Sequence, residues 1–338
     1  MEQSLTPYAD VAQAEVAATS AYLATAIASY RAKLARNTLT AHDRDLGLWS
    51  SYLAAVGVGS GLDWLDVLSW RDVGAGLVAG YAAWMAGEGY AVSSINRARA
   101  TIQAYCRIAA KVGVLPSSAW GAIRAIDGIS QRAGQRLDTT RPARRRSRKK
   151  TAPNVLSRAQ VGQLAAACAE SHAGLRDRVI VRVLADHGLR CGELAGLTWA
   201  GIDLVAGEMT FVRPKVSKTQ VHRLTRDAWA ALSAWAAVVA GHQGAHLGPV
   251  LWRVNKGDRL VAAGMSEITI ADRVRLLGVA IGVETLSPHD LRHSFATSAA
   301  RAGTSPIALR DAGGWSSMAT VSRYVESAAI ANDGVSLD

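Results

Sequence analysis

Residues 289–297 read His-Asp-Leu-Arg-His-Ser-Phe-Ala-Thr and directly follow Pro288. Because proline is favoured at the first position of a helix, a helix is predicted to begin here. Positions three apart share one helix face, so the imidazole of His289 and the guanidinium of Arg292 can converge on one phosphate. Histidine exchanges protons near neutral pH, whereas arginine stays charged and can hold two nonbridging oxygens. A lone His-x-x-Arg pattern is more often structural than catalytic, so its meaning depends on the residues around it.

One tyrosine follows this segment. Tyr324 is the only tyrosine after Tyr105, and it lies nine residues beyond Trp315 in Gly313-Gly314-Trp315. Phosphodiester chemistry needs a nucleophile and a cluster of positive charge at one point, and Tyr324 with the basic residues ahead of it supplies both. Other tyrosines, such as Tyr30, Tyr52 and Tyr105, lie in helical patterns of the first part and are expected in the core or an interface.

A second basic motif precedes these segments. Leu189-Arg190-Cys191-Gly192-Glu193-Leu194 is expected where one helix ends at His187-Gly188 and the next begins. An arginine at a helix start lies beside free backbone N–H groups, which suits phosphate, and Glu193 one turn on can orient Arg190. An ordinary surface Arg–Glu pair explains the motif equally well.

Between the two basic motifs, Glu208 to Arg213 alternates polar and apolar residues, and Val221 to Leu224 follows a polar connection at Lys215 to Gln220. This pattern predicts a β-hairpin. Lys218 and Lys215 both fall in its turn, where a lysine is most often simply exposed.

Composition indicates two domains in the 338 residues, mainly helical with a small sheet. We expect a helical domain at 1–135, a basic linker at 136–153 and a mixed α+β domain at 154–338. Three helical patterns lie in the first part: from Asn37 onward after the capping signal Asn37-Thr38-Leu39-Thr40, Val73 to Gly87, and Ser93 to Val112.

The net charge of +11 with only 19% charged residues predicts a polyanionic partner. Positive charge lies along the Ser93 to Val112 helix at Arg97, Arg99, Arg107 and Lys111, where either DNA contact or a plain solvated face is expected. Seven of the ten residues 141–150 are basic, which favours a linker that follows a nucleic-acid backbone over a localisation tag. The candidate DNA contacts there are Arg144, Arg145, Arg146, Arg148, Lys149 and Lys150.

Several classes of site are not expected. Cys106, Cys168 and Cys191 are widely separated and lack metal-ligand spacing, which fits a reducing compartment. We find no phosphate-binding Gly-x-x-x-x-Gly-Lys loop, no carboxylate cluster for a metal and no apolar run long enough to span a membrane. Without these motifs, neither a cofactor nor a metal is expected. The N-terminus lacks the features of a secretory or mitochondrial leader, so a soluble cytoplasmic protein is expected.

Taken in order, these segments resemble the tyrosine recombinase family, also called the phage integrase family, over about Asn154 to Val325. The first part resembles, more loosely, the family's core-binding domain. Residues 188–194 are similar to the family's first arginine box and residues 289–297 to its second. Gly313-Gly314-Trp315 departs from the commoner Leu-Gly-His and resembles the Cre-like members that carry Trp in the third box.

The resemblance implies a site-specific recombinase that cuts and rejoins DNA through a 3′-phosphotyrosyl intermediate and a Holliday junction, without ATP or metal. It implies double-stranded DNA with an inverted-repeat site as partner, and a homotetramer on two duplexes; accessory proteins stay open. Tyr324 would be the nucleophile and His289 its base, Arg190 and Arg292 would neutralise phosphate oxygens, Trp315 would donate its indole N–H, and Lys218, or else Lys215, would protonate the leaving oxygen. Glu193 would support Arg190.

Two other interpretations share these residues. A type IB topoisomerase would use the same groups but only religate its own cut, and a degenerate family member would bind DNA without cleaving it. Ser327 to Asp338 is expected either to dock on a neighbouring subunit or to be a disordered end.

Overall fold

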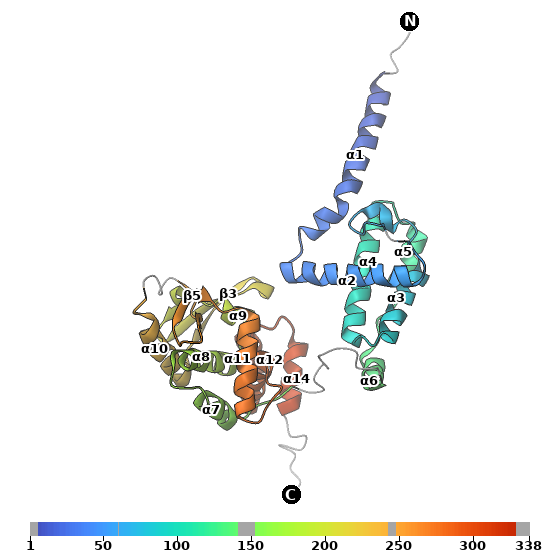
Figure 1. Cartoon of the computed structure of the whole chain (residues 1–338). Coiled ribbons are helices and arrows are strands. Elements are labelled where there is room, and N and C mark those ends of the chain that lie inside the picture. The colour runs from blue at the N-terminus through green and yellow to red at the C-terminus, as the bar shows by residue number, and fades with distance from the viewer. Residues whose placement is uncertain (1–5, 60, 141–152, 243–247, 329–338) are drawn as a thin grey trace. The chain divides into compact units, whose positions relative to one another are not determined.

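The computed structural model describes residues 6–59, 61–140, 153–242 and 248–328, in two compact units, Met1–Lys149 and Lys150–Asp338 (Figure 1). Within those residues no helix is both long and apolar enough to cross a membrane. The basic run 141–150 and the last ten residues lie outside the described part, so the linker contacts and the docking tail stay predictions.

The first unit is helical. Its elements are α1 (Thr6–Arg31), α2 (Arg36–Ala55), the 3-10 helix η1 (Val67–Trp70), α3 (Ala75–Gly87), α4 (Val92–Lys111), α5 (Ser117–Arg124) and α6 (Gln131–Thr140). Helix α4 packs against α2, α3, α5 and η1. An aromatic cluster fills the core, with Trp49, Trp70, Tyr81 and Tyr105 fully buried. The three helical patterns therefore form helices, and α6 covers the first positions of the segment expected as linker.

The predicted capping signal of α2 is wrong in detail. The helix begins at Arg36 with Ala35 as N-cap, and no side chain caps it. Asn37 to Thr40 lie within the first turns, because the buried stripe of the helix, with Leu46 and Trp49, decides its packing and the helix simply extends one turn further back.

The second unit surrounds the long helix α8. Its helices are α7 (Arg158–Ala166), α8 (His172–His187), α9 (Cys191–Ala195), α10 (Arg226–Val239), α11 (Glu267–Ala280), α12 (Pro288–Arg301), α13 (Pro306–Gly313) and α14 (Met318–Ala328). Helix α8 packs against α7, α10, α11 and α12, as Figure 1 shows for its neighbours α7, α10 and α11. Burial of Val179, Ile180, Val183 and Leu184 on α8 anchors the site-bearing helices around one core.

The predicted hairpin is confirmed, within a three-stranded antiparallel sheet in the order β1-β2-β3. Its parts are β1 (Ile202–Asp203) after the 3-10 turn η2 (Trp199–Gly201), β2 (Glu208–Arg213), the turn η3 (Pro214–Val216) and β3 (Lys218–Arg223); a separate pair is β4 (Trp252–Val254) and β5 (Leu260–Gly264). The connection is shorter than expected, because Pro214 starts a tight turn that Ser217 closes at φ 48°. Lys218 therefore opens β3, opposite Arg213, instead of lying in a loop.

Two local features position the site in the second unit. Ser287 caps α12 by accepting the N–H of Asp290, with Pro288 at the first turn, which confirms the predicted helix start. Helix α8 ends at Gly188 with φ 62°, and a Cβ there would lie 2.3 Å from the ring of Phe295. Glycine is needed because both the left-handed backbone and this close packing exclude a side chain. The turn at Gly188 brings the start of α9 beside α12.

Candidate active site

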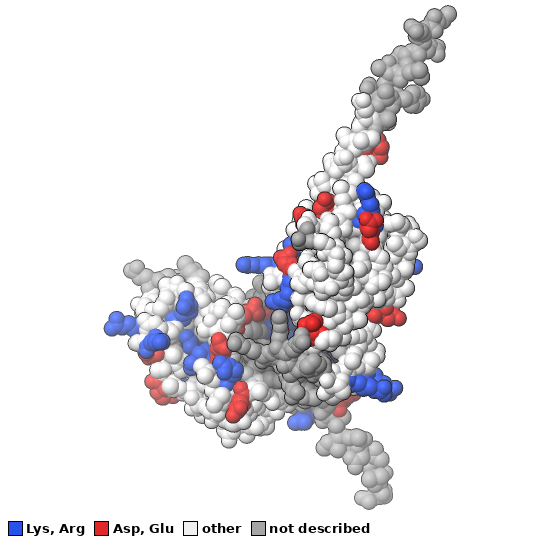
Figure 2. Space-filling view, turned by 45° about the vertical axis from the view of Figure 1, so that its right-hand side comes forward, with Lys and Arg blue, Asp and Glu red and all other residues white. Residues whose placement is uncertain are grey.

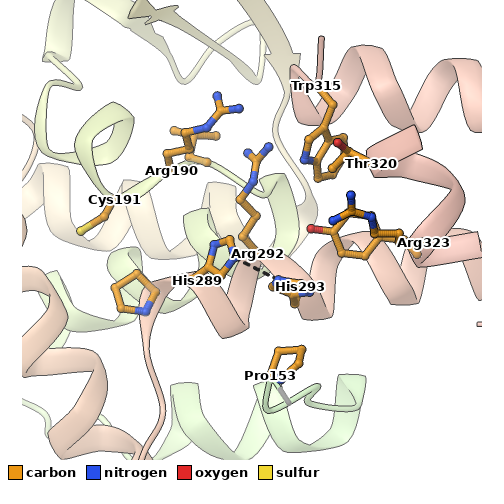
Figure 3. Close-up of a pocket in the computed structure, with 12 residues that line it drawn as sticks. Pro153, Arg190, Cys191, His289, Arg292, His293, Trp315, Thr320 and Arg323 are labelled. Atoms are coloured by element: carbon orange, nitrogen blue, oxygen red, sulfur yellow. Dashed lines mark hydrogen bonds between the residues drawn. The ribbon is translucent and has the colours of Figure 1, made fainter. Parts of the chain in front are cut away.

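A cleft of about 620 Å³ opens in the second unit, where the starts of α9 and α12 meet α14 (Figure 3). Five of the six predicted catalytic residues line it: Arg190, His289, Arg292, Trp315 and Tyr324. The remaining lining residues are Pro153, Leu189, Cys191, Pro288, His293, Thr320 and Arg323. Residues far apart in the chain thus share one cavity, which sequence spacing alone could not establish.

Arg292 is held rigidly. Its guanidinium is buried and donates to the carbonyl oxygen of Gly188 and, at 2.5 Å, to that of Gly313. The Cζ atom lies 4.5 Å from the ring centre of Trp315. Burial, followed by the charges of Arg190 and Arg213, lowers the pKa of Arg292 to about 10. The side chain is therefore charged at neutral pH and poorly neutralised, which favours an incoming anion.

Arg190 is oriented by Glu193, as predicted from the sequence. The Glu193 carboxylate accepts the backbone N–H of Arg190 at 2.8 Å and its Nη1 at 2.6 Å. The other terminal nitrogen, Nη2, donates to the carbonyl oxygen of Gly314 at 3.2 Å. The side chain of Arg190 is 27% exposed, whereas that of Glu193 is buried. The guanidinium is thus fixed from behind while remaining open to the cleft.

Arg213 and Gln220 were not predicted from the sequence. Arg213 ends β2 fully buried, and its guanidinium donates to Glu193 and to the carbonyl oxygen of Ala312, each at 2.7 Å. It also contacts the amide oxygen of Gln220, whose Nε2 donates to the carbonyl of Asp311 at 2.7 Å. The strand pattern could have indicated Arg213, because positions 209, 211 and 213 share the inward face of β2. An arginine buried on that face requires a carboxylate beside it.

The end of α13 and its connection to α14 need two successive glycines, Gly313 and Gly314. Gly314 has φ 60°, and a Cβ there would lie 2.4 Å from the Arg213 side chain. A Cβ on Gly313 would lie 1.7 Å from the ring of Trp315. Trp315 therefore occupies the space that any side chain at position 313 would fill.

Tyr324 is buried against two rings. Its ring centre lies 5.2 Å from that of Trp315 and 5.1 Å from that of His293. Burial raises the pKa of the phenol, against the opposing charges of Arg292, Arg323 and Arg190. The hydroxyl is therefore protonated at neutral pH, and a base must accept its proton before it can attack phosphorus.

A second histidine, which was not predicted as a site residue, pairs with the predicted base. The Nε2 atoms of His289 and His293 lie 3.0 Å apart, one helical turn apart on α12 (Figure 3). Burial, followed by the charge of His289, lowers the pKa of His293. The i, i+4 spacing of the two residues was the available signal.

The candidate lysine lies at the hairpin and not in the cleft lining. Lys218 is exposed and pairs in register with Arg213, and Lys215 lies in the preceding turn η3. The role of Lys218, or else of Lys215, as proton donor stays a prediction.

Two of the four basic residues on α4 that were considered as DNA contacts, Arg97 and Arg99, have structural partners. Arg97 forms a bidentate ion pair with the fully buried Asp45, with its Nη2 at 2.7 Å and its Nε at 3.2 Å. Arg99 donates to the carbonyl oxygen of Ile126 beyond the end of α5. These hydrogen bonds give both arginines a place in the fold of the first unit. Their contact with DNA remains a prediction.

Among the described residues, no group of three or more His, Cys, Asp and Glu side chains could hold a metal. Cys106 and Cys168 are buried free thiols, and Cys191 is half-buried beside Arg190. Burial raises the pKa of the Cys191 thiol to about 11, so it is protonated at neutral pH.

Residues 154–330 match the model of the phage integrase family, and residues 28–113 match that of the phage integrase N-terminal SAM-like domain. The chain belongs to the phage integrase family. The tyrosine recombinase XerC of Pelobacter propionicus is 28% identical over 292 residues, which cover 86% of this chain and 85% of that protein. XerC of Xanthomonas campestris strain B100 is 29% identical over 173 residues, which cover 51% of each protein, so this match spans about half of that relative.

Solved structures share the fold at low identity. The Tn1549 transposon integrase in complex with a circular intermediate DNA has a TM-score of 0.62 at 16% identity, covering 89% of this chain and 94% of that one. The lambda integrase tetramer bound to a Holliday junction has a TM-score of 0.60 at 15% identity, covering 94% and 80%. At these identities the likeness establishes the architecture of this phage integrase family member, and no more.

Proposed function

We propose that this chain is a site-specific DNA recombinase that breaks and rejoins DNA strands through a 3′-phosphotyrosyl intermediate. The observation that carries the proposal is the cleft in which the Tyr324 phenol lies with the guanidiniums of Arg190 and Arg292. A nucleophile beside two fixed positive groups is the arrangement that phosphoryl transfer requires. Family membership and the XerC relatives support the same conclusion.

The first step forms one bond and breaks one. The Tyr324 oxygen attacks phosphorus, its proton passes to His289, and the bond from phosphorus to the 5′ oxygen breaks. Lys218 donates a proton to that oxygen, so the products are a 3′-phosphotyrosyl strand and a free 5′ hydroxyl. Arg190 and Arg292 neutralise the nonbridging oxygens as charge builds on the five-coordinate phosphorus. The phosphodiester energy stays in the covalent bond, so a 5′ hydroxyl of a partner strand can reverse the step.

Trp315 takes the place of the histidine of the commoner third box. Its indole N–H would donate to a phosphate oxygen, and its ring lies over Arg292. Together with Gly313 and Gly314 this supports a place among the Cre-like members, by motif.

Double-stranded DNA with an inverted-repeat site is the proposed partner, with four protomers on two duplexes. The lambda integrase tetramer on a Holliday junction shares the fold and supports this assembly. Basic and acidic side chains are interspersed on the drawn face of the second unit (Figure 2). In the sequence, seven of the ten residues 141–150 are basic. We place the protein in the cytoplasm, with residues 136–153 tracking the DNA backbone between the two domains.

The test uses a duplex selected for binding from a library of randomised sequences. Nicks at successive positions let the short 5′-hydroxyl fragment diffuse away and trap any covalent adduct. We expect an adduct, and joining of ends from two different duplexes when intact sites are mixed. Rejoining confined to the protein's own cut would indicate a topoisomerase, and binding without adduct at every nick would indicate a DNA-binding protein without catalysis.

A further inference from the structure

A buried arginine outside the cleft is connected to the residues that line it. Arg213 is fully buried at the end of β2 and is absent from the cleft lining, yet its Nη1 lies 2.7 Å from Glu193 Oε2. The other carboxylate oxygen, Oε1, lies 2.6 Å from Nη1 of Arg190. One carboxylate is therefore shared by two guanidiniums, of which only Arg190 faces the cleft.

The charges of this cluster decide what Arg190 can offer a phosphate. Two arginines and one carboxylate leave one net positive charge, whereas Arg190 and Glu193 alone would be neutral. The ion pairs are shielded from solvent, since the side chains of Arg213 and Glu193 are 0% and 3% exposed, so this difference is poorly screened by water. Arg213 thus supplies the charge that keeps the Arg190 end of the cluster attractive to an anion.

Arg213 also connects the hairpin to the end of α13, just ahead of Trp315. Arg213 donates to the carbonyl of Ala312, while Gln220 on β3 accepts from Arg213 and donates to the carbonyl of Asp311. These carbonyls lie in the last turn of α13, directly before Gly313 and Gly314, whose own carbonyls accept from Arg292 and Arg190. Carbonyls at a helix C-terminus carry partial negative charge. Gln220 satisfies the carbonyl of Asp311, and three arginines satisfy those of Ala312, Gly313 and Gly314.

We propose that Arg213 is a positioning residue for the cleavage step. It compensates the charge of Glu193, so that Arg190 keeps its positive charge and its orientation for the scissile phosphate. The inference rests on the proposed function and adds a residue that never touches the DNA.

The test compares two substrates that differ at the scissile phosphate. One is the nicked duplex described above, and the other carries a methylphosphonate, in which a methyl group replaces one charged oxygen. A neutral phosphate has less need of the charge on Arg190. We expect Arg213→Gln to slow single-turnover cleavage of the phosphodiester by at least about tenfold and that of the methylphosphonate by less than about twofold.

A compensating variant separates charge balance from folding. Glu193→Gln combined with Arg213→Gln removes both buried charges and leaves Arg190 with the same net charge as in the native cluster. The double variant should therefore cleave the phosphodiester faster than Arg213→Gln alone. Arg176→Gln is the matched control: Arg176 is also buried and bonds Asp177 at 2.7 Å, but it lies outside the cleft lining. It should change thermal stability without any preference between substrates.

Each outcome decides the question. Equal slowing on both substrates, unchanged rates, or a double variant no faster than the single one would overturn the proposal. If Arg213→Gln does not fold, the folded double variant decides, since it must retain phosphodiester cleavage. A native protein that forms no adduct on either substrate would refute the proposed function itself, whereas native cleavage with indifferent variants refutes the role of Arg213 alone.

Discussion

At the scale of single residues, Arg292 carries the largest expected effect. Its guanidinium bonds two backbone carbonyls and lies over Trp315, so it is fixed before DNA arrives and loses little entropy on binding. Arg292→Ala should lose about 3 kcal/mol of transition-state stabilisation, roughly a hundredfold in cleavage rate. The measurement is the single-turnover rate of adduct formation at saturating protein.

Arg273→Ala is its matched control. Arg273 on α11 forms an ion pair with the buried Asp177 at 2.5 Å and lies outside the cleft lining. It should leave the cleavage rate within about twofold of the native value. A comparable loss in both variants would mean that Arg292 acts on the fold and not on the phosphate.

The pair His289 and His293 makes cleavage pH-dependent. Because the pKa of His293 is lowered below its ordinary value of 6.5, this ring is neutral above that pH and gains a proton only as the pH falls below it. Two charged rings 3.0 Å apart would repel, and a protonated His289 could not accept the phenolic proton. The cleavage rate should therefore hold above pH 6.5 and fall below it. His293→Asn keeps a hydrogen-bonding group that does not titrate, while His289 still titrates, so the variant should shift the position of this limb along the pH axis. An unchanged profile would show that His293 plays no part in it.

Part of the site could be predicted from the local spacing of residues in the sequence. Helix periodicity accounts for the place of both His289 and Arg292 in the cleft lining, and a spacing of three within one turn accounts for the Arg190–Glu193 contact. Arg213 was not readable in the same way, because its partners are 20 residues back and 99 residues ahead in the chain. Only the folded hairpin brings these groups together. The position of Arg213 on the inward face of β2 was the one sign in the sequence that it needs a buried partner.

At the scale of elements, the turn between α13 and α14 couples Gly313 to Trp315. A side chain at position 313 would occupy the place of the indole ring. Gly313→Leu should therefore displace Trp315 and reduce cleavage by at least about tenfold, with DNA binding retained. The double variant Gly313→Leu with Trp315→His restores the commoner family pattern in a smaller ring and should recover part of the rate.

The comparison with Trp315→His alone gives the coupling between the two positions. A double variant as slow as the product of the two single effects would contradict the steric explanation. Gly303→Leu provides a control for the general cost of filling a turn glycine with φ above zero, since nothing lies within 4 Å of its Cβ position.

Element boundaries were predicted with uneven success for a physical reason. Starts with strong local chemistry, such as Ser287 and Pro288, were recovered, because one cap and one proline determine them. The predicted hairpin connection was too long, because Ser217 adopts a left-handed conformation that the polar residues around it do not predict. The start of α2 was displaced because tertiary packing extended the helix past a polar segment.

At the scale of the whole molecule, the basic run at 141–150 should dominate non-specific affinity for DNA. Replacing Arg144, Arg145 and Arg146 with alanine should flatten the plot of log affinity against log salt by about 0.9 for each phosphate that the protein no longer neutralises. Arg275→Ala is the control, because Arg275 is exposed on α11 and already faces Asp272. An unchanged slope in the triple variant would exclude the linker from the DNA interface.

The proposed chemistry requires that the oxygen of Tyr324 becomes bonded to DNA. Mass spectrometry of the trapped adduct, after digestion with protease and nuclease, identifies the residue that carries the DNA. We expect a nucleotide phosphate on the peptide that contains Tyr324, a free 5′ hydroxyl on the released strand, and no adduct for Tyr324→Phe although it binds DNA normally. An adduct on another residue, or one that persists in Tyr324→Phe, would contradict the assignment of Tyr324 as the nucleophile.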